Sequence, residues 1–204
     1  MSNKITLKSI VNDKVSGSSK ILEKLNRYIM QNADDTVKLR NSLSNIRKAL
    51  KDFAAINSYI EKVGKLIDTG DTKKLRDFTK SFDTGKNEAY NNIYNKARHY
   101  FSRFNTILTL SNSKTLLEVF KIWSGKNKKL KIIVCESQPK NEGIIFAKAL
   151  AKANIKVQLI TDASISNYIA NADTVIIGAD MILKNGNVVN KTGSMNAAII
   201  CRYF

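Results

Sequence analysis

The sequence has little proline, cysteine and histidine, and these shortages limit the helix breaks, disulfide bonds and metal sites that the protein can contain. Pro139 is the only proline, so no proline breaks a helix in the first hundred residues. The two cysteines, Cys135 and Cys201, have neither metal-ligand spacing nor enough partners for a disulfide framework, and we expect both to be buried, reduced thiols. His99 has no second histidine to join, which favours a surface or packing role. We expect no metal and no cofactor.

Long apolar runs are also missing. No run approaches the roughly 18 residues that a membrane span requires, and the first ten residues lack the apolar stretch of a secretory signal. The 204 residues are 43% apolar and 25% charged, which is typical of a globular protein with a sizeable core. We therefore expect a cytoplasmic protein without membrane contact.

Acidic residues are scarce relative to basic ones. The chain has 17 Asp and Glu against 34 Lys and Arg, a formal net charge of +17, and such a surplus can serve nucleic-acid binding. The basic runs are short, however, at Lys73 and Lys74 and at residues 126–131, and no aromatic residues are interleaved for base stacking. We favour a solvated, lysine-rich surface and keep a nucleic-acid-associated protein as a further alternative.

In the first hundred residues, apolar positions recur at the three- and four-residue spacing of helices. The stripes lie at residues 21–29, 39–67 and 90–104. Asp34, Asp35 or Thr36 can cap the start of the longest stripe, and Gly70 lies just past its end. That stripe is compatible with a coiled-coil seam, although helix-on-helix core packing is commoner. The sequence predicts helices almost throughout this part.

The pattern changes near Asn105, where short apolar runs begin to alternate with amphipathic segments. The runs are residues 106–110, 132–135, 157–160 and 174–177, and the segments are 114–123, 142–153 and 164–171. Alternating strands and helices imply a parallel sheet with right-handed crossovers. Residues 181–190 then indicate a hairpin with an Asn185-Gly186 turn, before a last helix from about Ser194. We predict an all-helical domain over residues 1–104 and an α/β domain over residues 105–204.

Small and polar residues follow all four predicted strands. Ligands of open parallel sheets bind beyond the carboxyl ends of the strands. The residues at these positions are Ser111, Asn112 and Ser113; Glu136, Ser137 and Gln138; Thr161 and Asp162; and Gly178, Ala179 and Asp180. Ser113 can cap a helix whose free amides suit a phosphate. A ligand cleft and ordinary helix capping explain this pattern equally well.

Asp180 comes directly before the hairpin, at the end of the fourth predicted strand. A carboxylate there can act as an acid or a base if burial raises its pKa, or it can simply cap the hairpin. Asn190, Lys191 and the Thr192-Gly193-Ser194 turn follow the hairpin. The lysine cation and the turn amides indicate an anionic ligand.

The stretch VIIGADMILKNGNVVNKTGS, residues 175–194, resembles the signature of the initiation factor 2B alpha, beta and delta subunits. Methylthioribose-1-phosphate and ribose-1,5-bisphosphate isomerases share that signature. TILTLSNSKTLLEVF, from Thr106, and CESQPKNEG, from Cys135, are similar to upstream segments of the same family in order and spacing. DKVSGSSKIL, from Asp13, resembles the Ser-Gly-Ser opening of the family's helical part.

This resemblance implies a helical domain, a Rossmann-like domain and a ligand site at the strand ends between them. It implies dimers or higher oligomers, and the translation initiation machinery as a partner. The family continues past the last predicted helix, so we expect the C-terminal part of the domain to be missing relative to the family, in either a fragment or a naturally shortened member. The ligand-binding residues that the resemblance implies are Ser16, Gly17, Ser18, Asn112, Ser113, Glu136, Gln138, Asn190 and Lys191.

The family's isomerases place a cysteine and an aspartate beside the sugar. Asp180 matches the aspartate, but Ser111 stands at the cysteine position and Leu110 at the histidine before it. A serine hydroxyl ionises far less readily than a thiol, and the sequence reveals no base to activate it. Gln138 stands at an arginine position, which weakens any grip on phosphate. Cys135 lies one strand away and is expected to pack in the core.

We therefore predict a non-catalytic regulatory protein of initiation factor 2B type, with a cleft for a phosphorylated sugar or a nucleotide. The alternative is an aldose–ketose isomerase of sugar phosphates, in which Asp180 and Ser111 are catalytic.

Overall fold

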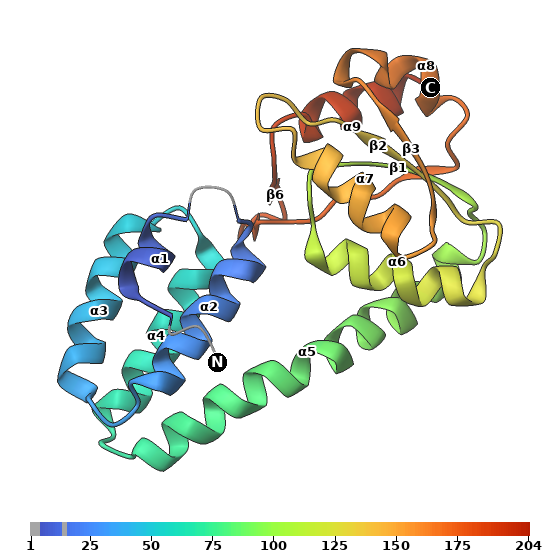
Figure 1. Ribbon diagram of the computed structural model, residues 1–204. Helices are drawn as coiled ribbons and strands as arrows, with labels where there is room; N and C mark the ends of the chain where they lie inside the picture. The colour runs from blue at the N-terminus through green and yellow to red at the C-terminus, as the bar shows by residue number, and fades with distance from the viewer. Residues whose placement is uncertain (1–4, 14–15) are drawn as a thin grey trace. The chain divides into compact units, whose positions relative to one another are not determined.

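A computed structural model describes residues 5–13 and 16–204 of the chain. The chain divides into two compact units, the first reaching to Asn87 and the second running from Glu88 to Phe204 (Figure 1). Among the described residues, the first unit contains helices joined by turns and no strand, and the strands lie in the second unit. This confirms the predicted order of a helical part followed by a parallel-sheet part.

Within residues 5–13 and 16–87, the first unit contains five helices, the last of which continues into the second unit. They are α1 (Leu7–Val11), α2 (Ser18–Gln31), α3 (Thr36–Ala49), α4 (Ala54–Asp68) and α5 (Thr72–Phe101). The long apolar stripe is divided between α3 and α4, because the chain turns at Leu50 and resumes as a helix after Phe53. Both helices contribute to one core, so the stripe is helix-on-helix packing and the coiled-coil alternative is wrong.

The ends of these helices follow the predicted signals. Asp35 caps α3, its side chain accepting a hydrogen bond of 2.9 Å from the Lys38 amide. Gly70, just beyond α4, has a φ of +70°, a conformation that favours glycine. Inside the unit, the fully buried Asn26 donates its side-chain amide to the Thr79 carbonyl and accepts from the Tyr59 hydroxyl. A buried amide satisfied on both sides holds three helices in register.

The second unit contains a four-stranded parallel sheet in the order β3-β2-β1-β4. The strands are β1 (Thr106–Leu110), β2 (Lys131–Cys135), β3 (Lys156–Ile160) and β4 (Thr174–Val175). The elements between them are α6 (Lys114–Lys126), α7 (Glu142–Lys152), the short η1 (Asp162–Ser164) and α8 (Ile165–Ile169). Each predicted strand is therefore present, with β4 two residues shorter than its apolar run.

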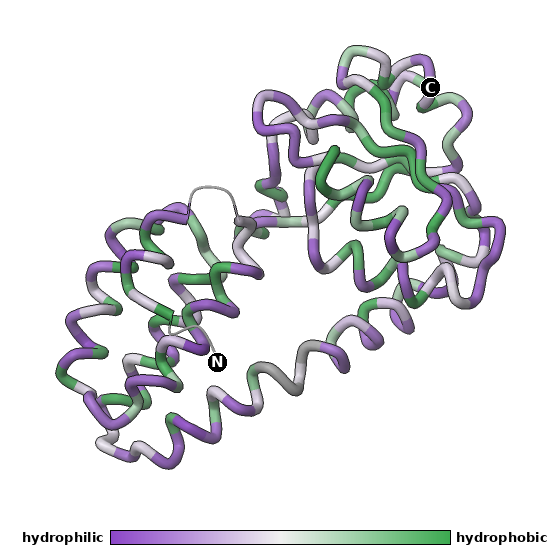
Figure 2. Tube along the Cα trace, viewed as in Figure 1, coloured by the Kyte–Doolittle hydropathy of each residue, from purple (hydrophilic) through white to green (hydrophobic). Residues whose placement is uncertain are grey.

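Alternate residues of the strands enter two different cores on opposite faces of the sheet. Ile132 and Val134 pack in one core with Phe120 and Trp123 of α6, Phe146 of α7 and Phe101 at the end of α5. Ile133 and Cys135 pack in the other core with α8 and α9 (Ser194–Tyr203). Figure 2 shows these strands as the most continuous hydrophobic segments. Burial on both faces explains why they are apolar runs rather than alternating sequences.

The hairpin follows β4 as predicted, with β5 (Met181–Ile182) paired antiparallel to β6 (Val188–Val189). Gly186, in its turn, has a φ of +84°. Secondary structure changes at Asn105, whereas the compact units divide inside α5, and the domain boundary at residue 104 stays a prediction. The expected burial of both thiols holds for Cys135 and is wrong for Cys201, which is exposed on α9. No helix within the described ranges is long and apolar enough to cross a membrane.

Candidate ligand site at the strand ends

The carboxyl ends of β1 and β2 lie side by side, because Leu110 pairs with Cys135 in the sheet. Ser111 and Ser137, which follow these ends, both have left-handed backbones, with φ of 65° and 64°. The Ser111 amide donates to the Ser137 hydroxyl at 2.7 Å, and that hydroxyl donates to the Cys135 carbonyl at 3.0 Å. Non-glycine residues adopt this conformation rarely, so the hydrogen bonds hold two costly turns in place.

Asp162, just after β3, holds the next segment. Its two carboxylate oxygens accept from the amides of Ser137, at 2.9 Å, and Gln138, at 2.7 Å. The peptide bond between Gln138 and Pro139 is cis. The carboxylate of Asp162 is thus engaged by the backbone, and it positions the side chain of Gln138 at the site.

The start of α7 lies against the end of β2, and Gly143 makes this possible. A Cβ at Gly143 would lie 1.7 Å from the Cys135 carbonyl oxygen, so no other residue fits without a backbone shift. Because α7 approaches so closely, Glu142 reaches the end of β1, where the Ser111 hydroxyl donates to its Oε2 at 2.7 Å. Lys191 Nζ lies 3.9 Å from Glu142 Oε1.

Glu142 is the functional candidate that the sequence did not reveal. The sequence contained no evident base for Ser111, but the structure places a half-buried carboxylate on its hydroxyl. The feature of the sequence that points to Glu142 is its place, next to a glycine, at the start of the predicted helix after the second strand. Ser111, Glu142 and Lys191 form a hydroxyl–carboxylate–ammonium chain from three separate elements. Such a chain can bind polar groups or pass a proton.

The turn before α9 carries the other predicted residues. Gly193 has a φ of +95°, and the Asn190 side-chain amide donates to the Ser194 hydroxyl at 2.9 Å. The Asp180 amide donates to the Val189 carbonyl at 2.9 Å, which closes the hairpin. The side chain of Asp180 is exposed, and among the described residues no hydrogen bond joins it to Ser111. The burial that its acid–base role was expected to need is absent.

A cavity of about 120 Å³ opens between the strand ends and this turn. Its lining residues are Leu110, Cys135, Gln138, Asp162, Ile165, Thr192, Gly193 and Asn196. Ligand pockets usually enclose about 300 Å³ or more, so this cavity suits part of a ligand, such as one phosphate group. Burial, together with the charges of Asp162 and Glu136, raises the pKa of the Cys135 thiol to about 12. The thiol is therefore protonated at neutral pH and is no nucleophile.

The remaining predicted residues have separate positions. Asn112 is exposed, and the Ser113 hydroxyl caps α6 by accepting from the Leu116 amide at 3.3 Å. Glu136 is half-buried at the end of β2, and its amide donates to the Ile160 carbonyl at 2.9 Å. Ser16, Gly17 and Ser18 belong to the first unit, where Ser18 is the first residue of α2 and Ser16 and Gly17 precede it. The ligand contacts expected of all these residues stay predictions.

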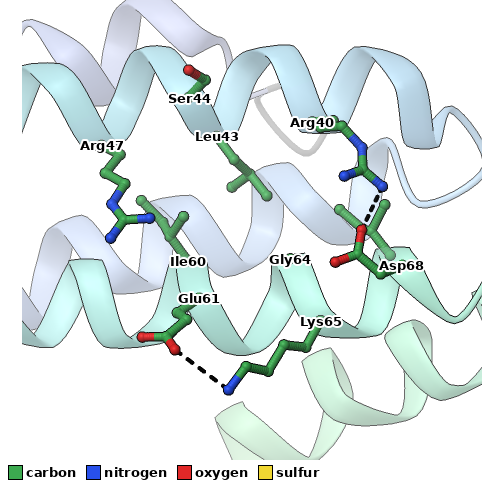
Figure 3. Close-up of a pocket in the computed structure, with 10 residues that line it drawn as sticks. Arg40, Leu43, Ser44, Arg47, Ile60, Glu61, Gly64, Lys65 and Asp68 are labelled. Carbon is green, nitrogen blue, oxygen red and sulfur yellow. Dashed lines mark hydrogen bonds and ion pairs between the residues drawn. The ribbon is translucent and has the colours of Figure 1, made fainter.

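A second hollow, of about 330 Å³, lies between α3 and α4 in the first unit (Figure 3). Leu43 and Ile60 form its apolar floor. Two ion pairs stand at its rim, Arg40 with Asp68 at 2.6 Å and Lys65 with Glu61 at 3.4 Å. Its charges of both signs are mostly paired with each other, so the hollow offers little to a charged ligand. In the part of the chain that the structure describes, no cluster of three potential metal ligands occurs.

The fold and the site together define a class: a helical unit followed by a parallel sheet with polar residues gathered at the ends of its strands. The chain belongs to the Initiation factor 2 subunit family, which it matches over residues 5–204. The particular relatives carry two kinds of name. A Pyrococcus furiosus protein described as translation initiation factor eIF-2B subunit 2-like is 28% identical over 198 residues, 96% of this chain and 72% of that protein. The ribose 1,5-bisphosphate isomerase of Methanocaldococcus jannaschii is 39% identical over 95 residues, 47% of this chain and 31% of that protein.

Solved structures show the same fold. The translation initiation factor eIF-2B of Pyrococcus horikoshii OT3 superposes with a TM-score of 0.83 at 24% identity, over 97% of this chain and 73% of that one. A chain of the tetrameric eIF2B-beta2-delta2 complex of Chaetomium thermophilum superposes with a TM-score of 0.70 at 17% identity, over 97% of this chain and 73% of that one. Proteins of this fold thus include initiation factor subunits, and some of these subunits form a tetrameric complex.

Proposed function

We propose that this chain is a regulatory protein of the initiation factor 2B type that binds a phosphorylated sugar or a nucleotide and does not transform it. The observation that carries the proposal is the chemistry at the end of β1. The group there is the hydroxyl of Ser111, and the nearest thiol, Cys135, is buried with its pKa raised to about 12. A site without an ionisable thiol lacks the nucleophile or acid expected of the related isomerases.

Groups for an anionic ligand support the binding part of the proposal. Lys191 supplies a cation beside the cavity, and the turn at Gly193 begins α9, whose first amides point toward the N-terminal end of that helix. Gln138, a neutral side chain, also lines the cavity. One ammonium group and backbone amides without a guanidinium favour weak binding of a phosphate.

A second candidate is an aldose–ketose isomerase, and one contact favours it. Glu142 accepts the hydrogen bond of Ser111 at 2.7 Å and is able to draw off its proton. The similarity to proteins named ribose 1,5-bisphosphate isomerase also supports this reading. The position of Asp180 counts against it, because the side chain is exposed and, among the described residues, no hydrogen bond joins it to Ser111.

The two candidates are separated by comparing wild type, Ser111→Cys and Asp180→Asn. Binding of ribose 1,5-bisphosphate and methylthioribose 1-phosphate is measured by calorimetry, and turnover by product analysis. We expect weak wild-type binding without efficient turnover, and increased turnover in Ser111→Cys alone, since acid–base partners contribute about 100- to 10,000-fold each. Rapid wild-type turnover would refute the non-catalytic function. A folded protein that binds neither ligand would refute the ligand site.

Self-association and a partner in the translation initiation machinery belong to the same proposal, as does a cytoplasmic location. Apolar side chains on the hairpin and α9 are exposed, including Ile182 at 70%, Met195 at 72% and Ile199 at 60%. Exposed apolar side chains mark protein contacts where they form a continuous patch. Light scattering is expected to give a dimer or a larger particle, and a stable monomer at high concentration would contradict that expectation.

A further inference from the structure

The edge of the sheet opposite the ligand site collects basic residues from several elements. Parallel strands all begin at one edge, and α6 and α7, which return between strands, end at that edge. Lys126 and Lys152 are the last residues of these two helices. Lys131 and Lys156 begin β2 and β3 and are direct partners in the sheet register. Residues separated by 25 positions in sequence thus become neighbours.

Three more cations complete this surface, which we call the basic edge. Lys128 and Lys129 form the turn between α6 and β2, and Arg103 lies between α5 and β1. The basic edge therefore consists of Arg103, Lys126, Lys128, Lys129, Lys131, Lys152 and Lys156. All but the half-buried Lys131 are exposed, and none pairs with a carboxylate of the described residues.

The other polar contacts of the basic edge leave its charge uncompensated. Lys126 Nζ lies 4.9 Å from the centroid of the Tyr94 ring, and Arg103 lies 3.2 Å from the ring nitrogen of His99. Among the described residues that begin these strands or end these helices, Asp173 alone is acidic. Its carboxylate already accepts hydrogen bonds from the amides of Asn105 and Thr106. An external anion is therefore the partner that this surface lacks.

Preferences at helix ends explain only part of the cluster. Lysines near the C-terminus of a helix interact favourably with its dipole, which accounts for Lys126 and Lys152. The helix dipole does not explain Lys128, Lys129 and Lys156, because these lysines lie in a turn and at the start of a strand. Neighbouring unpaired cations repel one another, and a polyanion removes this cost while it releases counterions.

We propose that the basic edge binds the phosphate backbone of a nucleic-acid double helix without reading its bases. Sequence-independent binding of single strands uses rows of aromatic side chains as well as cations. His99 and Tyr100 are the exposed aromatic side chains among the described residues near this edge, and two adjacent residues do not make a row, so the surface suits regular phosphate rows instead. The shared chemistry is that of RNA and DNA duplexes. This function is independent of the ligand site at the opposite edge.

The test is fluorescence anisotropy with a labelled 16-base-pair duplex of mixed sequence, prepared as RNA and as DNA. About four phosphate contacts predict a slope of log affinity against log salt near −3.6, about a 150-fold loss between 50 and 200 mM salt. Tighter binding of one duplex shows whether the basic edge prefers RNA or DNA. A slope shallower than about −1 for both duplexes would overturn the proposal.

Matched variants locate the surface. Lys128→Gln/Lys129→Gln/Lys156→Gln removes three cations of the basic edge, and Lys48→Gln/Lys51→Gln/Lys62→Gln removes three exposed cations of the first unit. The first variant is expected to lose at least tenfold in affinity at 50 mM salt and to flatten the slope by about 2.7, while the control keeps the wild-type slope. Equal losses in both variants, or equal competition by polyglutamate, would refute a nucleic-acid surface. Thermal melting of both variants checks that they are folded.

Discussion

Ser111 and Glu142 lie 31 residues apart in the chain, and the Ser111 hydroxyl donates to Glu142 Oε2 at 2.7 Å. The contact joins the end of β1 to the start of α7. Two features make it possible: the left-handed backbone of Ser111, which aims its side chain, and Gly143, which allows α7 to approach β2. The hydrogen bond between Ser111 and Glu142 therefore depends on the close packing of α7 at Gly143.

A double-mutant cycle measures this contact. Ser111→Ala, Glu142→Ala and the double variant are expected to show a coupling of about 1 to 2 kcal/mol in the free energy of unfolding, because the acceptor is charged and half-buried. The exposed pair Glu61 and Lys65 is the control, with an expected coupling below about 0.5 kcal/mol. Urea denaturation gives the free energy of unfolding of the wild type and of all six variants. Equal couplings for the two pairs would mean that the Ser111 contact is solvated.

Gly143→Ala is expected to destabilise the fold by at least about 3 kcal/mol, because the new Cβ would collide with the Cys135 carbonyl. Gly64→Ala in α4 is the matched control. Nothing lies within 4 Å of its new Cβ, so the change should stabilise by up to about 1 kcal/mol through helix propensity. Thermal melting compares the two, and a tolerated alanine at position 143 would contradict the close packing of α7 on β2.

Asp173 provides a pH test. The amides of Thr106 and Asn105, which donate to its carboxylate, hold the pKa of Asp173 below its ordinary value of 3.8. A lowered pKa stabilises the folded state above the unfolded pKa, and this contribution disappears as pH falls through the folded value. Asp173→Asn should therefore cost about 1 kcal/mol at pH 6, a modest figure because the carboxylate is exposed. The difference from wild type should shrink below about pH 4. A difference that does not change with pH would disagree with this account.

The buried amide of Asn26 tests the helical unit. Asn26→Ala removes the side chain that bonds both the Tyr59 hydroxyl and the Thr79 carbonyl, and it leaves a small cavity. The expected loss is about 2 to 4 kcal/mol. Asn45→Ala, at an exposed position of α3, should change stability by less than about 0.5 kcal/mol. Chemical denaturation followed by circular dichroism distinguishes the two.

The two thiols should react very differently. Cys135 is buried, and its pKa is raised to about 12, whereas Cys201 is exposed, although partial burial raises the pKa of its thiol too. In the folded protein, iodoacetamide at pH 8 is expected to label Cys201 and leave Cys135 intact. Both should react after denaturation, as mass spectrometry can verify. Rapid labelling of Cys135 would show that the strand ends are open to solvent.

The local spacing of apolar residues predicted most of the helices and strands. The spacing of apolar residues changes near Asn105, and the helices and strands follow that change. The turn at residues 50–53 was not predicted, because the three- and four-residue spacing of apolar residues continues on both sides of it. A single apolar stripe therefore belongs to two helices. The hairpin was predictable, because Asn185-Gly186 specifies a turn by itself.

The sequence by itself determined the order of helices and strands, the residues at the strand ends and the family. Each depends on neighbouring residues, or on a contiguous motif such as residues 175–194. Only the tertiary structure placed Glu142 on Ser111, left Asp180 exposed and gathered the basic edge from separate elements. The physical reason is that periodicity determines which face of an element is buried. How closely α7 approaches β2 depends on packing between segments far apart in the chain.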